Sequence, residues 1–305
     1  MSARLDVHQH LWPERLLDAL SRRAASPRLR RRREGWVLHL DGEPEWPVDP
    51  RDHDPARRAA LVARDGLDLA IIAPSSPLGV EALPADEAGP LVDAYNDGVA
   101  ELPPALRAWA TAGLAAPAPG DLAARLDAGL VGLCLPAAAL SSAEAVAAAA
   151  PLLGVLEERS AALLVHPGPA APVADPGARP AWWPALTDYV AQMQAAWLGF
   201  REWARPAHPR LRVCFAMLAG LAPLHAERLA SRGTDAGARD PLAFYDTSSY
   251  GPGAIAAMAA VVGPEALVHG SDRPVVDPPG QPVHPDPART ANPERLLALS
   301  RRDLT

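Results

Sequence analysis

The chain has 305 residues, a formal net charge of −7 and a hydrophobic content of 49%. The length suits one α/β barrel, which typically takes about 250 residues, and the acidic balance gives no reason to expect a nucleic-acid partner. All 29 basic residues are arginine. The lack of lysine excludes a Schiff-base enzyme, a P-loop nucleotide site and a carboxylated lysine bridging two metal ions.

Short apolar runs alternate with stretches of helical periodicity along the whole chain. The apolar runs predict strands near residues 3–8, 68–74, 107–114, 130–135, 161–166, 211–217, 243–248 and 266–271. The helical stretches lie near residues 55–65, 86–102, 119–128, 142–159, 185–204, 221–232, 252–262 and 292–302. Eight β-α pairs in this order predict an α/β fold, a (β/α)8 TIM barrel that forms a single domain over residues 1–305.

Two connections are longer than such a barrel needs. Residues 11–54 follow the first strand, and residues 167–184 follow the fifth. Because both follow strands, we expect these insertions over the carboxyl-terminal mouth, where long loops shape substrate pockets. The first insertion contains the cluster Arg30–Arg33, which could bind an anionic group but fits a solvated face better.

The cysteines and the amino-terminal segment bear on the cellular compartment. Cys134 and Cys214 each lie in an apolar run, which is typical of buried small side chains in a reducing environment. Residues 1–10 do not resemble a secretory leader, and no run approaches the ~20 apolar residues of a membrane span. We therefore expect a cytoplasmic enzyme that acts on a small molecule and has no membrane partner.

The first strand ends in the run Asp6-Val7-His8-Gln9-His10. Because His8 and His10 are two residues apart on a strand, both imidazoles point to one face. His166 closes the fifth apolar run and Asp272 follows the eighth, and the carboxyl ends of barrel strands share one mouth. Three imidazoles and a carboxylate there predict a divalent-metal site better than buried core histidines and an Asp272 that only caps a turn.

These motifs resemble those of the amidohydrolase superfamily. The similarity is to the amidohydrolase-related group that includes aminocarboxymuconate-semialdehyde decarboxylase and the resorcylate-type decarboxylases. It spans roughly residues 3–276 and includes Phe244–Ser248 near strand seven. The resemblance implies that His8, His10, His166 and Asp272 bind one divalent ion, zinc before manganese or iron, and that a homodimer is an option.

The sixth strand departs from that family, which has a histidine where this chain has Met217. Methionine is a poor ligand for a hard divalent ion, so we expect Met217 to line the substrate pocket. His225 lies two residues after Pro223, at the start of the next helix. It is our candidate for a catalytic group that reaches back into the mouth, and a surface position is the alternative.

Further residues are candidates for contact with the substrate. Arg273 could hold a substrate carboxylate through two hydrogen bonds, although a structural ion pair explains it equally well. Trp182 lies at the end of the second insertion and could form an aromatic wall, or simply pack against the barrel. The end of strand seven, residues 245–250, adds Tyr250.

Four enzyme classes suit these residues. The leading prediction is a metal-dependent hydrolase of an amide or lactone-type bond, in which a metal-activated water attacks and Asp272 moves the proton. The first alternative is a non-oxidative decarboxylase of an aromatic or enolic carboxylic acid. A non-haem iron oxygenase and a metal-free lactonase are further alternatives. A binding protein without activity explains the four strand-end residues least well.

Overall fold

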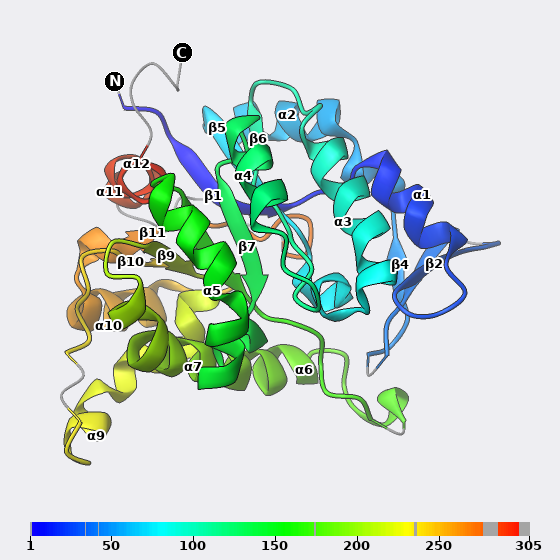
Figure 1. Ribbon diagram of the computed structural model, residues 1–305. Coiled ribbons are helices and arrows are strands. Elements are labelled where there is room, and N and C mark those ends of the chain that lie inside the picture. Colours follow the sequence, from blue (N-terminus) through cyan, green and yellow to red (C-terminus); the bar gives the residue numbers. More distant parts are fainter. Residues whose placement is uncertain are drawn as a thin grey trace.

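A computed structural model describes residues 2–33, 35–41, 43–173, 175–234, 237–276 and 286–298. The last predicted helix, 292–302, is seen as α12 (Ala291–Leu297), and its final residues lie outside the described part of the chain. Eight parallel strands form the centre of the molecule (Figure 1). They are β1 (Leu5–His10), β5 (Leu69–Ala73), β6 (Leu106–Ala108), β7 (Gly132–Pro136), β8 (Ala162–His166), β9 (Arg212–Phe215), β10 (Ala243–Asp246) and β11 (Leu267–Val268).

The strands pair in chain order and close on themselves. Hydrogen bonding defines two sheets, β1-β5-β6 and β11-β10-β9-β8-β7. A parallel bridge from Ala110 to Leu133 joins β6 to β7. On the other side, Val7 donates to the carbonyl of His269 and Gln9 bridges Arg273. The predicted barrel is therefore confirmed, with one seam after β6 and a second between β11 and β1.

Helices follow the strands and cover the outside of the barrel. Two of them begin at side-chain caps: Asp54 accepts from the amides of Ala56 and Arg57, and Ser142 accepts from Ala145. Such caps satisfy amides that have no partner inside the helix. The main outer helices are α2 (Pro55–Arg64), α3 (Ala85–Val99), α4 (Pro119–Asp127), α5 (Ala143–Glu158), α7 (Asp188–Gly199), α9 (Ala226–Ala230) and α10 (Pro252–Val262).

The core has two layers. Side chains such as Val7, Ile71 and Trp109 fill the inside of the barrel, and the Trp109 indole donates to the carbonyl of Val7 at 2.9 Å. A larger apolar layer separates the strands from the helices. Both cysteines are free and fully buried, as the sequence predicts.

The first insertion contains a small sheet that the sequence analysis did not predict. After α1 (Glu14–Arg22), strands β2 (Arg28–Arg32), β3 (Gly35–His39) and β4 (Trp46–Val48) form an antiparallel sheet beside α1 (Figure 1). Arg30 donates to the carbonyls of Ser21 and Arg23, and Arg32 pairs with Glu45. Arg31, Arg32 and Arg33 are exposed, so most of the cluster is a solvated face, as predicted, and Arg30 has a structural role.

The segment after β9 differs from the helix predicted for 221–232. An irregular turn, Met217–His225, comes first, and regular helix begins only at Ala226. Met217 to Leu221 all have left-handed φ values of 50° to 64°. Only glycine adopts this conformation without cost, and only Gly220 in this run is glycine. The turn delays the start of the helix.

Candidate metal centre

Strand β1 aims His8 and His10 into the barrel through a β-bulge. Asp6 pairs with Ala70 but Gln9 pairs with Ile72, so β1 contains one residue more than β5. The extra residue lets Val7 face the interior and still turns the following histidines toward the mouth. Their relative exposures are 1% and 3%. Bulges often re-aim side chains beside active sites.

His166 and Asp272 come from the opposite sheet. His166 is the last residue of β8 and is buried. Asp272 follows β11 with a left-handed φ of 59°, a conformation that aspartate tolerates better than most residues. Gly270 permits this approach, since a Cβ atom there would lie 2.7 Å from the Asp246 carboxyl.

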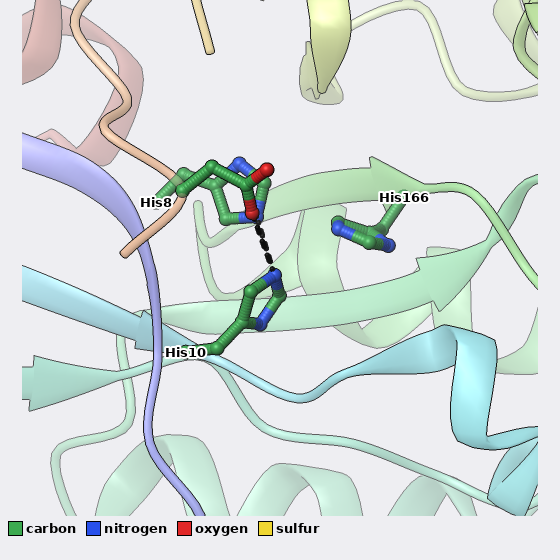
Figure 2. Close-up of side chains that lie close together, drawn as sticks. His8, His10 and His166 are labelled. Atoms are coloured by element: carbon green, nitrogen blue, oxygen red, sulfur yellow. Dashed lines mark hydrogen bonds and ion pairs between the residues drawn. The ribbon is translucent and has the colours of Figure 1, made fainter. Parts of the chain in front are cut away.

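The four side chains converge. The Nε2 atoms of His8 and His10 are 3.1 Å apart, and Asp272 Oδ1 lies 3.1 Å from His10 Nε2 and 3.8 Å from His8 Nε2. The three rings stand nearly perpendicular to one another, with centroids 4.8 to 5.0 Å apart (Figure 2). One donor atom from each of the four residues lies within 4.8 Å of the others. The cluster therefore has the size of a site for one ion.

Hydrogen bonds fix the tautomer of each histidine. His8 Nδ1 lies 2.6 Å from Asp246 Oδ2, His10 Nδ1 lies 3.1 Å from the carbonyl of Ala73, and His166 Nδ1 lies 2.9 Å from the carbonyl of Pro167. Because these partners are acceptors, each Nδ1 carries a proton, which leaves each Nε2 as the atom that can bind a metal ion once any proton on it is released. Two imidazole nitrogens 3.1 Å apart can share a proton, and a divalent metal ion can take the place of that proton, so these donors fit a divalent metal.

Asp246 is a functional residue whose role the sequence analysis did not recognise. The sequence analysis placed it only among the possible substrate contacts at residues 245–250, the end of β10. In the structure its carboxylate is fully buried and holds the His8 ring in place. Burial lowers the pKa of His8, but Asp246, Asp272 and Asp6 outweigh that effect and raise it to about 9. An aspartate at a strand end was the available signal, but its partner lies 238 residues away.

Electrostatics keep Asp272 ionised. Burial raises the pKa of Asp272, but the hydrogen bond from His10 and the charges of the three histidines lower it to about 2. Burial and the charges of His8 and His10 hold the pKa of His166 well below its usual value. The site thus combines an anionic oxygen with a neutral imidazole at His166, which is the form that metals bind.

Asp6 anchors β1 to the segment that follows β11. Its Oδ1 accepts from the amides of His8 (3.0 Å) and Ser271 (3.1 Å), and its Oδ2 accepts from Gln9 Nε2 (2.8 Å). These bonds bring Ser271, and with it Asp272, next to the histidine pair. Asp6 is therefore a positioning residue.

The other candidate residues lie outside this cluster. Met217 is half-buried at the end of β9, and Tyr250 is half-buried against the core. Trp182 is 56% exposed, and His225 is exposed just before α9. Arg273 Nη2 lies 2.9 Å from Asp65, which is the structural ion pair.

Comparisons with known proteins were made by sequence and by structure. No family model and no curated protein matches the sequence. The apo form of IDCase from Metarhizium anisopliae is similar with a TM-score of 0.77 at 17% identity, covering 97% of both chains. The 5-carboxyvanillate decarboxylase of Novosphingobium aromaticivorans, complexed with manganese and 4-hydroxy-3-methoxy-5-nitrobenzoic acid, has a TM-score of 0.69 at 17% identity and covers 98% of this chain and 96% of its own. The 2,6-dihydroxybenzoate decarboxylase from Rhizobium has a TM-score of 0.68 at 15% identity, with coverages of 98% and 99%.

These similarities show the fold. The chain has the same barrel fold as these solved structures, as the sequence motifs suggested. The leading prediction, a hydrolase, is wrong, because similar solved structures are decarboxylases of aromatic acids. The strand-end motifs do not separate the two reactions, since one divalent ion can activate a water for hydrolysis or stabilise developing negative charge in a decarboxylation. Among the described residues, no helix is long and apolar enough to cross a bilayer.

Proposed function

We propose that this protein is a metal-dependent, non-oxidative decarboxylase of an aromatic or enolic carboxylic acid. The observation that carries the proposal is the convergence of three imidazole lone pairs and one carboxylate at the barrel mouth. Structural neighbours that decarboxylate hydroxylated benzoates support the substrate class.

His8, His10, His166 and Asp272 would hold the divalent ion. When bound, such an ion supplies positive charge that stabilises developing charge on a substrate oxygen. We propose zinc or manganese, because imidazole nitrogens suit zinc and a neighbour contains manganese.

Decarboxylation consumes one proton for each carbon dioxide released, because the carbon that loses the carboxylate must gain hydrogen. We assign the transfer of this proton to Asp272. Its side chain is 13% exposed, more than those of His8 and His10, and its Oδ2 accepts from the exposed Ser249 hydroxyl at 3.3 Å. Asp272 rests ionised, so it would take up this proton only transiently, from solvent on the side of Ser249, and pass it on within the site.

The remaining candidates are proposed as follows. Met217 and Tyr250 would give apolar contact to the substrate ring, and Trp182 would contribute only at the rim because it is largely exposed. The ion pair with Asp65 favours a structural role for Arg273 over a substrate clamp. A catalytic role for His225 requires a shift from its exposed position, and His225→Ala tests it.

The deciding experiment combines metal analysis with a carbon dioxide assay. Protein purified without chelators should contain about one zinc or manganese per chain and should release carbon dioxide from members of a phenolic acid panel. His8→Ala and His10→Ala should each abolish both properties, while His39→Ala, at a half-exposed histidine of β3, should change neither. Full metal content and rate in the first two variants would refute the site.

The same measurements address the oxygenase alternative. Bound iron together with oxygen uptake, and no carbon dioxide from any phenolic acid, would replace the decarboxylase with an oxygenase.

A further inference from the structure

His53 is a buried imidazole beside the metal-binding strand to which no role has been given. It ends the 3-10 turn Pro50–His53 at the close of the first insertion, and only 8% of it is exposed. The question is which of its two nitrogens is available to a ligand.

Trp12 fixes both the orientation and the tautomer of His53. The backbone amide of Trp12 donates to His53 Nδ1 at 3.0 Å, and the two rings stack at 4.6 Å with an interplanar angle of 10°. The Trp12 indole is itself held by Ser75 Oγ at 2.9 Å. Because Nδ1 accepts a hydrogen bond, the proton of the neutral ring must be on Nε2.

Arg58 ties this segment to the end of β1. Its buried guanidinium donates to the carbonyl of His10 at 2.8 Å and to the carbonyl of Asp52, next to His53, at 2.6 Å. Burial and the charges of Arg58 and His10 lower the pKa of His53 to about 4. His53 is therefore a neutral ring held close to a metal ligand.

The available atom of His53 is a donor, in contrast to the ligand histidines. Its Nε2–H has no hydrogen-bond partner among the residues that the structure describes, whereas the ring nitrogens of His8, His10 and His166 converge on the place of the proposed ion. A carboxylic acid substrate brings anionic oxygens to the site and needs donors as well as the metal. Met217, at the end of strand six, cannot donate.

We propose that His53 is a catalytic residue whose Nε2–H donates a hydrogen bond to an oxygen of the bound carboxylic acid. This inference rests on the proposed decarboxylase function. It assigns to His53 the recognition of the substrate anion, with no proton transferred.

Two substitutions test the two ring nitrogens of His53 separately. In His53→Asn the side-chain oxygen can replace Nδ1 as acceptor for the Trp12 amide, but the donor at Nε2 is lost. In His53→Gln the longer side chain can place an amide N–H where Nε2 was. His39→Asn, on β3 of the same insertion, is the matched control.

The experiment measures the binding of a nitro-substituted phenolic acid to metal-loaded protein. The absorbance change of the acid reports binding, and the amount bound is divided by the amount of metal in each variant. We expect His53→Asn to weaken binding and kcat/KM by about 10- to 100-fold, as for a lost hydrogen bond to a charged group. His53→Gln should stay within about threefold of the wild type, and His39→Asn should not differ from it.

Two results would overturn the proposal. One is unchanged binding per bound metal in His53→Asn. The other is an equal loss in His53→Asn and His53→Gln, since restoring the donor would then restore nothing. If the wild-type protein binds the probe but releases no carbon dioxide from any acid, the decarboxylase function fails while the His53 contact is still tested by binding.

Discussion

The orientation of the three clustered histidines depends on acceptors that lie outside the cluster. The Asp246 carboxylate is the charged one, and it contacts His8 Nδ1 at 2.6 Å. Partners of this kind set ligand basicity and ring orientation. The cluster is therefore best understood with its supporting acceptors included.

Asp246→Asn should weaken metal binding by about 10- to 100-fold, because it removes the negative charge that holds the His8 ring. Competition with a chromophoric chelator would measure the affinity. Asp93→Asn, at an exposed acidic residue of α3, serves as control. Equal affinities of wild type and Asp246→Asn would show that the carboxylate does not support the site.

Glu81 links a single residue to the pH dependence of stability. It is 2% exposed, and its Oε1 accepts from Ser76 Oγ at 2.7 Å and from Thr111 Oγ1 at 3.3 Å. Burial raises the pKa of Glu81 above its ordinary value of 4.5 and outweighs these hydrogen bonds. The folded state therefore binds more protons than the unfolded state above pH 4.5, and this contribution to stability falls as pH rises through the folded-state pKa.

Glu81→Gln should abolish the loss of stability that the Glu81 carboxyl causes as pH rises. We expect the variant to gain free energy of unfolding relative to the wild type at pH 8 and to show a smaller difference at pH 4. Denaturant titrations at both pH values measure this. A difference that is independent of pH would mean that the Glu81 carboxyl titrates normally in the folded protein.

At the scale of elements, the turn after β9 is the most strained backbone in the described chain. Each non-glycine residue in the left-handed region costs about 1–2 kcal/mol, and this turn has four in the five positions from 217 to 221. Ala219→Gly should therefore stabilise the protein by roughly 1 kcal/mol. Gly220→Ala should destabilise it, because its φ is 58° and a Cβ atom would lie 2.7 Å from the carbonyl of Val190.

Thermal unfolding of the two variants checks the prediction, with opposite shifts in Tm expected. A fall in Tm for Ala219→Gly would mean that the buried methyl group contributes more than the backbone strain costs.

The sequence predicted the barrel and the convergence of His8, His10, His166 and Asp272 because each depends on a local pattern. A short apolar run that ends in histidine or aspartate places that side chain at the shared mouth, whatever the distance along the chain. The left-handed turn was not predictable, since Leu218 and Ala219 favour other conformations. The β2–β4 sheet was hidden because the Arg28–Arg32 strand lacks an apolar face. The Asp246–His8 contact required knowledge of strand order.

On the scale of the whole molecule, one hydrogen bond joins the first insertion to α7, the helix that comes after the second insertion. The Tyr189 hydroxyl donates to Glu43 Oε1 at 2.5 Å. Burial and the negative charges of Glu43, Asp188 and Asp272 raise the pKa of Tyr189, so the phenol stays protonated within reach of the Asp272 charge. The bond ties the first insertion to the start of α7, and we expect it to restrain access to the cluster.

Tyr189→Phe should speed the removal of bound metal by a chelator by about 2- to 10-fold, because a bond worth about 0.5–1.5 kcal/mol no longer opposes opening. Stopped-flow chelation measures the rate, with Tyr95→Phe, at a buried tyrosine of α3, as control. Identical rates for Tyr189→Phe and wild type would show that the bond does not limit access.

The two seams divide the barrel into two parts, and each part contributes two of the four residues of the cluster. The β1-β5-β6 sheet holds His8 and His10, and the chain after β6 holds His166 and Asp272. Gly129, in an exposed turn between α4 and β7, separates these parts. A gene divided there would encode two polypeptides with half a coordination sphere each. Tight retention of one ion would then show that the halves had reassembled, so the divided protein would serve as a split reporter read by metal content.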